Sequence, residues 1–354
     1  MNKKVLIKFV FIIIIIILLY LKKSKHLIKK NIFYSYFNKS LEQPKSLDNS
    51  NLGENKTIKY NQYIPIAYAL NEGYFYPTFV SIISILVNSN ISCCYVIYLL
   101  LAADGSFPEL LINKFKELEN QYHNCKIIFI DIEEEIYAKA FTKRYPKATY
   151  YRLLIADIVT DYDRVIYLDG DTIIFNDLIE MINLDMKNNI ALGWVDNGFI
   201  NAKQFNVTIN HYITAGVILF NVKKMREENI TDKLFNFMNK YYEQLNQEDQ
   251  TILNIVLYDR IDFLPAKYGI WTYNNIDDLI YHNHFKNTSS PIKGYDDKEI
   301  IKALYEPGIA HYVRSKPWKP ITKHTCLRFR KIWWDYAQLS GEYKYIKEYY
   351  NLDK

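Results

Sequence analysis

The chain has 354 residues, 49% of them hydrophobic, so it is long enough to bury a sizeable core in one large domain or two small ones. The net charge is +5, and eight lysines among the first thirty residues more than account for it, which leaves the rest of the chain slightly acidic. This charge balance argues against a nucleic-acid-binding protein.

The four cysteines argue against a disulfide-rich or zinc-binding protein. Cys93, Cys94, Cys125 and Cys326 include no Cys-x-x-Cys spacing of the kind that holds a metal. Four cysteines are also too few to make a disulfide framework for a chain of this length. The sequence allows one bridge without indicating its partners.

The N-terminus predicts a membrane anchor followed by a stem. Residues 9–21 are apolar, which is short for a span of about 20 residues, but no small-residue cleavage site follows as in a signal peptide. We therefore predict an uncleaved signal anchor over 1–23 and a flexible, polar stem over 24–59. A disordered extension without a function is the alternative to the stem. Lysines flank both ends of the apolar run, so the orientation stays open.

Six Asn-x-Ser/Thr sequons favour a body that faces a secretory lumen. They begin at Asn38, Asn55, Asn90, Asn206, Asn229 and Asn287. We expect a type II single-pass protein with its body in the Golgi or ER lumen. The alternative is a bacterial protein associated with the inner membrane on its cytoplasmic face, which the lysines after the anchor favour.

From Tyr60 the chain alternates between predicted strands and helices. Apolar or β-branched runs predict strands over 64–70, 95–102, 126–132, 165–168, 190–195, 213–222 and 261–264. Helices are predicted over 77–87, 148–159, 233–245 and 249–258. Another helix is predicted from a capping box of Ser106 and Glu109 to about residue 122. The pattern is irregular from residue 269 to about 309, and one or two helices close the chain. This alternation predicts an α/β fold whose mostly parallel sheet has helices on both faces.

The chemistry is expected where the buried strand 165–168 runs into Asp169-Gly170-Asp171. Side chains alternate along a strand, so the two carboxylates point the same way, and Gly170 allows close approach to the backbone. Carboxylates at the end of a buried strand favour a divalent cation, Mg²⁺ or Mn²⁺, between them. An ordinary surface turn would also contain Asp and Gly.

Three further polar clusters would complete such a site. Arg152 precedes the central strand and its guanidinium suits sugar hydroxyls or phosphate, although a surface Arg would look the same. Asp249 and Gln250 begin a helix, where acidic residues are common in any case. His311 follows an apolar run and suits a metal, but a single His at such a position is usually structural. Lys316, further along the same segment, suits a phosphate.

Taken in order, these segments resemble glycosyltransferase family 8, retaining enzymes of the GT-A fold that include lipopolysaccharide glucosyl- and galactosyltransferases and glycogenin. The resemblance covers about residues 64–319. It rests on 64–69, Tyr-Tyr-Arg-Leu at 150–153, Val-Ile-Tyr-Leu-Asp-Gly-Asp at 165–171, Ala-Gly-Val at 215–217, Asp-Gln-Thr-Ile-Leu-Asn at 249–254, and His311 with Lys-Pro-Trp at 316–318. It implies a nucleotide-diphospho-sugar transferase, Rossmann-like domain over 60–320 and a C-terminal helical extension over 321–354.

The resemblance also implies roles for individual residues. Asp169, Asp171 and His311 would hold Mn²⁺ (or Mg²⁺), and Arg152, Asp249 and Gln250 would be the catalytic residues. The implied nucleotide and donor-sugar contacts are Ala69, Asn71, Tyr74, Arg152, Asp169, Gly170, Asp171, Thr214, Ala215, Asp249, Gln250, His311 and Lys316. Gln250 would lie under the anomeric carbon. A carboxamide is a poor nucleophile, which favours same-face attack over a covalent intermediate, and the sequence leaves that choice open.

Three positions depart from the family pattern. Asn71 stands where many relatives carry a carboxylate, Thr214 stands where relatives often carry Asn, and Arg314 stands where the motif around the metal-binding His usually has glycine. None of the departures removes an implied metal ligand.

We therefore expect a Mn²⁺-dependent retaining glycosyltransferase that moves glucose or galactose from a UDP-sugar to a glycan or glycoconjugate acceptor. The alternatives are a non-catalytic protein of the same fold that binds a sugar nucleotide, and a metal-dependent phosphatase or nucleotidyltransferase. The sequence indicates neither the acceptor nor the oligomeric state.

Overall fold

The computed structural model describes residues 59–103, 105, 107–133, 146–196, 204–205, 207, 210–272 and 294–352. Contacts divide the chain into two units, Met1–Glu54 and Asn55–Lys354, and every described residue belongs to the second. The predicted anchor over 1–23 and the predicted stem over 24–59, apart from Lys59, lie outside the described residues.

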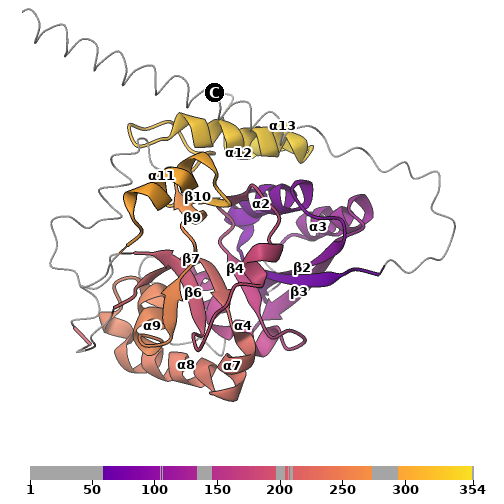
Figure 1. Cartoon of the computed structure of the whole chain (residues 1–354). Helices are drawn as coiled ribbons and strands as arrows, with labels where there is room; N and C mark the ends of the chain where they lie inside the picture. Colours follow the sequence, from indigo (N-terminus) through magenta and orange to yellow (C-terminus); the bar gives the residue numbers. More distant parts are fainter. Residues whose placement is uncertain are drawn as a thin grey trace, which may run out of the picture. The chain divides into compact units, whose positions relative to one another are not determined.

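A mixed sheet forms the centre of the described part of the chain (Figure 1). Its strand order is β3-β2-β1-β4-β7-β6-β8. The strands are β1 (Gln62–Ala69), β2 (Cys93–Ala102), β3 (Cys125–Ile132), β4 (Val165–Leu168), β6 (Ala191–Val195), β7 (Ile213–Phe220) and β8 (Ile261–Phe263). Every residue of β4, β6 and β7 is buried, as expected of strands covered on both faces. The strand pairing confirms the predicted mostly parallel sheet.

One strand, β7, runs against its neighbours. It pairs antiparallel with β4 and with β6, whereas the other pairs of this sheet are parallel. The beginning of β7 consequently lies at the carboxyl end of β4, and Asp169 N donates to Gly216 O at 2.8 Å. Residues from the start of one strand and from just beyond the end of another thus meet at one edge of the sheet.

A smaller sheet of β5 (Thr172–Ile174), β10 (Ile309–His311) and β9 (Tyr268–Trp271) lies beside that edge. β10 pairs antiparallel with β5, and this register sets His311 opposite Thr172. Tyr312 N also donates to Asp171 O at 3.0 Å. β9 was not predicted, because irregular structure was expected after residue 269. The strand is short and contains Gly269 at φ +112°.

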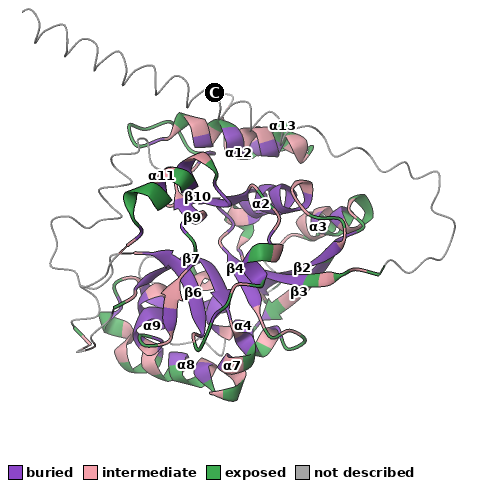
Figure 2. Cartoon of the chain, in the orientation of Figure 1, coloured by how far each residue is buried: buried purple, intermediate pink, exposed green. Residues whose placement is uncertain are grey.

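Helices cover both faces of the sheet (Figure 1). On one side lie α2 (Phe75–Val87) and α3 (Glu109–Gln121), and on the other lie α7 (Val222–Glu227), α8 (Ile230–Tyr241) and α9 (Glu248–Val256). The C-terminal α12 (Leu327–Leu339) packs on α2 and is followed by α13 (Tyr343–Tyr349), so the predicted helical extension is confirmed. The remaining helices are η2 (Glu72–Tyr74), η4 (Lys147–Leu154), α4 (Ile155–Ile158), α5 (Ile179–Ile182), η5 (Tyr242–Gln244) and α11 (Asp297–Tyr305). Figure 2 shows α2 almost wholly buried, whereas α3 and α8 keep an exposed face.

The helix predicted over 148–159 is confirmed as a helical segment, made of the 3-10 helix η4 followed by the one-turn helix α4. η4 buries four consecutive side chains, which an amphipathic α-helix would not do. The predicted capping box is wrong, because α3 begins at Glu109 with Pro108 at its N-cap. The four cysteines are free, so the described part of the chain has no disulfide bridge.

Within the described ranges, no helix is both long enough and apolar enough to cross a membrane.

Candidate functional site

The predicted site residues come together around one cavity at the carboxyl ends of β1 and β4. The cavity has a volume of about 310 Å³. Its lining includes all thirteen residues predicted from the sequence: Ala69, Asn71, Tyr74, Arg152, Asp169, Gly170, Asp171, Thr214, Ala215, Asp249, Gln250, His311 and Lys316. They come from segments far apart in the sequence, which the antiparallel β7 and the small sheet bring to one edge.

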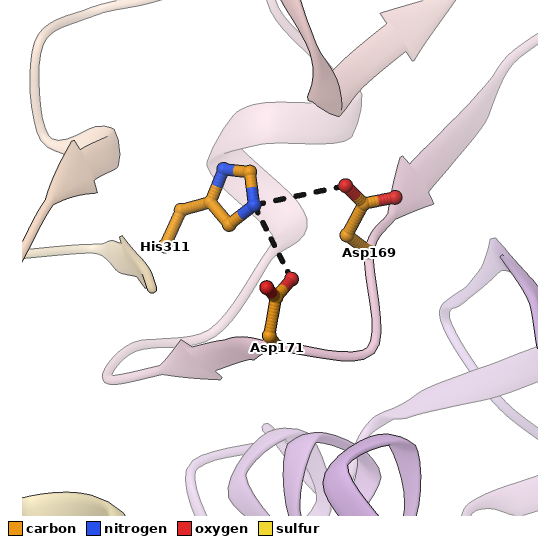
Figure 3. Close-up of side chains that lie close together, drawn as sticks. All are labelled: Asp169, Asp171 and His311. Atoms are coloured by element: carbon orange, nitrogen blue, oxygen red, sulfur yellow. Dashed lines mark ion pairs between the residues drawn. The ribbon is translucent and has the colours of Figure 1, made fainter. Parts of the chain in front are cut away.

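Asp169, Asp171 and His311 face one another at this edge (Figure 3). His311 Nε2 lies 3.3 Å from Asp171 Oδ1 and 3.6 Å from Asp169 Oδ2. One ligand atom from each residue lies within 4.8 Å of the other two. Asp171 and His311 are only 3% and 4% exposed, whereas the Asp169 side chain is 28% exposed to the cavity side.

The spacing of these atoms fits a divalent cation. An octahedral ion that holds its ligands at about 2.1 Å places adjacent ligand atoms about 3 Å apart and opposite ones about 4 Å apart. The two separations from His311 Nε2 lie within this range. Asp171 Oδ1 is buried and accepts no hydrogen bond from the described residues, so it is available as a ligand atom. Two carboxylates and one imidazole suit Mn²⁺ or Mg²⁺ better than a soft metal.

Lys316 lies against the same carboxylate. Its Nζ donates to Asp171 Oδ2 and to the carbonyl oxygen of Tyr312, the latter at 2.7 Å. Burial would raise the pKa of Asp171, but the positive charges of Lys316 and His311 outweigh it and hold the pKa well below its ordinary value. This lowered pKa favours the ionised form of Asp171.

Arg152 joins the metal-site carboxylates to the opposite wall of the cavity. It is 6% exposed; its Nη2 lies 3.0 Å from Asp169 Oδ1 and its Nε lies 3.1 Å from Asp249 Oδ2. Its Nη1 donates to Ala215 O, and the guanidinium lies 4.5 Å from the centre of the Tyr167 ring. Burial lowers the pKa of Arg152, but Asp169 and Asp249 raise it more, so the guanidinium stays charged. A buried Arg between two carboxylates is held in one orientation.

Asp249 is a buried carboxylate of the cavity with a raised pKa. It lies in the first turn of α9 and is 4% exposed. Burial raises its pKa to about 7, because the attraction of Arg152 only partly offsets the loss of water, and Asp169 and Glu248 repel its charge. A titratable group poised near neutrality in a cavity is typical of a functional site.

Gln250 is held at both ends of its carboxamide. Its Oε1 accepts from Ala215 N at 3.0 Å, and its Nε2 donates to Asp196 Oδ2 at 2.8 Å. The sequence analysis did not select Asp196, although it follows the buried strand β6 just as Asp169 follows β4. The same strand-end pattern that predicted Asp169 would have found it. Trp271 also lines the cavity and was missed together with its strand, β9.

Two glycines leave room at the site in different ways. At Gly216, a Cβ atom would lie 2.1 Å from His311 Cε1 and 2.7 Å from Asp169 Oδ2, so only glycine lets these two side chains meet. At Gly170, a Cβ atom would lie 2.2 Å from Thr78 Oγ1. Gly170 thus makes room for helix α2 and also lines the cavity, and its close approach to a ligand stays a prediction.

The remaining predicted residues form the walls of the cavity. Asn71 and Tyr74 lie at the two ends of a tight turn in which Tyr74 N donates to Asn71 O at 3.0 Å. The Tyr74 ring packs edge-on against Trp318 at 6.0 Å. Thr214 is buried, and its hydroxyl makes no hydrogen bond with the described residues.

Comparison with known proteins gives one family and a consistent set of relatives. The sequence model described as "Glycosyl transferase family 8" matches residues 65–322. General stress protein A of Bacillus subtilis is 29% identical over 206 residues, which cover 56% of this chain and 68% of that protein. Lipopolysaccharide 1,3-galactosyltransferase of Salmonella typhimurium is 26% identical over 245 residues, which cover 66% of this chain and 70% of that protein.

Among solved structures, the galactosyltransferase LgtC in complex with donor and acceptor sugar analogs aligns with a TM-score of 0.59. The sequences are 20% identical, and the alignment covers 79% of this chain and 96% of LgtC. This likeness shows the GT-A fold. The matches with other curated relatives span only 34% to 51% of the length of those proteins.

The relatives also correct the predicted localisation. They are proteins of bacteria such as B. subtilis and Streptococcus gordonii, which have neither a Golgi apparatus nor an ER. The expectation of a type II protein with a lumenal body is therefore wrong. The sequons on which it rested arise readily by chance in a chain so rich in Asn.

Proposed function

The chain belongs to glycosyl transferase family 8, and from this premise we propose that it is a metal-dependent retaining enzyme that transfers a hexose from a UDP-sugar to a glycan or glycoconjugate acceptor. The observation that carries the proposal is the convergence of Asp169, Asp171, His311 and Lys316 with Arg152, Asp249 and Gln250 on one cavity. The first four suit a metal-bound diphosphate and the others suit a sugar. The catalytic domain would extend over 60–320.

The leaving group is where charge develops. Breaking the glycosyl–phosphate bond puts negative charge on UDP, and a Mn²⁺ or Mg²⁺ ion held by Asp169, Asp171 and His311 would stabilise that charge. Lys316 lies beside Asp171 and adds a second positive charge on the same side. Tyr74 lines the cavity with its ring nearly perpendicular to that of Trp318, and it would stack on uracil there. Asn71 offers both a donor and an acceptor to the edge of the base.

The sugar would lie over the opposite wall. Arg152 and Asp249 form a fixed, buried pair, and they would bind donor hydroxyls as donor and acceptor respectively. Gln250 is anchored by Ala215 and Asp196, so its carboxamide would define the face of the sugar that is closed to the acceptor. Because a carboxamide is a poor nucleophile, we favour attack by the acceptor on the same face from which UDP leaves.

Galactose and glucose are the donor sugars we propose. Two similar proteins are described as galactosyltransferases, and one of them binds donor and acceptor sugar analogs.

The test is UDP release by the full chain from a panel of UDP-sugars, with and without Mn²⁺. Many transferases slowly hydrolyse their donor, so no acceptor need be known. We expect metal-dependent release from UDP-glucose or UDP-galactose, and proton NMR of the first sugar released should show the anomeric configuration of the donor. A protein that binds UDP tightly but releases none from any donor would instead be a non-catalytic sugar-nucleotide-binding protein. An inverted product would contradict retention.

A further inference from the structure

A row of polar side chains runs along a buried face of α2. Thr78, Ser81, Ser84 and Asn88 recur every three or four residues and therefore share one face of the helix. The first three are fully buried. Hydroxyl groups at buried helix positions are costly unless they find partners, so their presence calls for a physical account.

The lower part of this row holds strand β5. Ser84 Oγ accepts from Ile174 N at 2.9 Å and donates to Ser81 O at 2.6 Å. Asn88 Nδ2 donates to Ile174 O at 2.9 Å. Both backbone polar groups of Ile174 are therefore bonded to α2 side chains rather than to water, and β5 is fixed to the helix at that residue.

The upper part of the row reaches the segment that carries the two aspartates. Ser81 Oγ lies 2.9 Å from Thr172 Oγ1 and 2.9 Å from the Tyr68 hydroxyl. Thr172 Oγ1 in turn donates to Asp169 O at 2.9 Å. This last bond closes the turn Asp169-Gly170-Asp171, because it connects the first residue of the turn with the residue that follows the turn. Thr78 lies against the middle of the turn, where Gly170 leaves room for it.

The turn is thus fixed from two sides. On the side of the sheets, Asp169 N donates to Gly216 O and Tyr312 N donates to Asp171 O. On the side of the helix, the chain of hydroxyls from Tyr68 through Ser81 to Thr172 ends on Asp169 O. Hydrogen bonds are directional, so this second set specifies the position of the turn along α2 in a way that apolar packing would not.

We propose that Ser81, Ser84 and Thr172, the hydroxyl ladder of α2 and β5, are positioning residues that hold the two aspartates at metal-binding separation. None of them touches the metal. The inference rests on the proposed metal site of Asp169, Asp171 and His311. Groups that orient metal ligands in this way typically change metal affinity about 10- to 100-fold when they are removed.

Thr172 offers a matched pair of variants. Thr172→Val keeps the shape of the side chain and removes the hydroxyl, whereas Thr172→Ser keeps the hydroxyl and removes a methyl group. Binding of Mn²⁺ alone to the full chain is measured by electron paramagnetic resonance, and folding of each variant is checked by its urea midpoint. We expect the Kd for Mn²⁺ to rise at least about tenfold in Thr172→Val and to stay within about twofold of wild type in Thr172→Ser.

Each outcome has one meaning. A Thr172→Val variant that binds Mn²⁺ like the wild type overturns the ladder and leaves the metal site intact. Equal losses in both variants also overturn it, because packing of the methyl group would then be responsible. A wild-type chain that binds no Mn²⁺ overturns the metal site and the ladder together. If Thr172→Val does not fold, Ser81→Ala breaks the same chain of hydroxyls one bond earlier and should weaken Mn²⁺ binding in the same way.

Discussion

Asp171 is a carboxylate whose burial is offset by two neighbours. It has lost almost all contact with water, which disfavours its charge, yet Lys316 and His311 contact its two oxygens from different sides. A buried charge of this kind is stable only as long as its partners remain, and it becomes a strong ligand for a cation placed in the same pocket.

Asp171→Asn should abolish metal-dependent donor cleavage while leaving the fold intact. Asn has the same shape but is neutral, so the variant loses a charged ligand without leaving a cavity. We expect a fall of about a hundredfold or more in UDP release, which is the cost of removing one strong electrostatic contact to the transition state. The urea midpoint is measured alongside to show that the variant is folded, although Lys316 loses a charged partner. Asp161→Asn, at an exposed position, is the control; wild-type turnover by Asp171→Asn would contradict the metal assignment.

Asp249 should make the stability of the metal-free protein fall as pH rises. Its folded-state pKa of about 7 lies above its ordinary value of 3.8, so the folded state binds more protons than the unfolded state between these values. The free energy of unfolding therefore decreases from about pH 4 to about pH 7. The lowered pKa of Asp171 acts in the opposite direction, but only below pH 3.8, outside this window.

Asp249→Asn tests this because Asn does not titrate. Urea unfolding in EDTA at pH 5 and pH 8 should show a larger loss of stability in the wild type than in the variant, with each unit of pKa shift equivalent to about 1.4 kcal/mol. The same change of stability in both proteins would contradict the raised pKa.

At the scale of elements, the site depends on β7 running against β4. Had β7 been parallel, Thr214, Ala215 and Gly216 would lie at the opposite edge of the sheet from Asp169. The sequence predicted both strands, because long apolar runs identify buried strands. It could not predict the direction of β7, because strand direction follows from the connections and from tertiary packing. For the same reason it placed Ala215 in the site only through family resemblance.

Short elements were the ones that sequence patterns could not identify. β9 and α7 have four and six residues, too few for a period to emerge, and they are held by neighbours distant in sequence. Asp196 and Trp271 were missed for related reasons: the first follows a predicted strand but belongs to no distinctive motif, and the second belongs to β9. The carboxylates, Arg and His of the candidate site could be predicted because they occur in the same order as the motifs of the family. Asp196 and Trp271 could not, because neither belongs to such a motif.

Gly216→Ala should disturb the metal site through β7. The added Cβ would overlap His311 and Asp169, and β7 is hydrogen-bonded to β4 at this point, so the backbone has little freedom to move away. We expect Mn²⁺ affinity to fall about tenfold or more, with a loss of stability of about 1–3 kcal/mol from overpacking. Gly73→Ala is the control, because its Cβ would meet only Asn71 Oδ1, at 3.4 Å. Unchanged Mn²⁺ binding in Gly216→Ala would contradict the close approach of His311.

At the scale of the whole described unit, the end of the chain returns to the site. Tyr350, just after α13, packs against Trp318 at 5.9 Å, and its hydroxyl donates to Gly73 O at 3.2 Å. Trp318 in turn contacts Tyr74. The turn that carries Asn71 and Tyr74 and the segment that carries Lys316 are thus joined by an aromatic residue near the C-terminus. The sequence showed a tyrosine-rich tail but contained no pattern that linked it to the cavity.

Tyr350→Ala should therefore weaken UDP binding without removing activity. Loss of one aromatic contact is worth about 0.5–1.5 kcal/mol, which corresponds to roughly a two- to tenfold rise in the Kd for UDP, measured by calorimetry in the presence of Mn²⁺. Affinity for Mn²⁺ alone should not change, because Tyr350 contacts none of its three ligands in the described part of the structure. Tyr345→Ala removes a more exposed tyrosine within α13 and should leave UDP binding unaffected. Equal effects of the two substitutions would mean that α13 only adds stability to the fold, and no effect of Tyr350→Ala would mean that the nucleotide wall is held without the C-terminus.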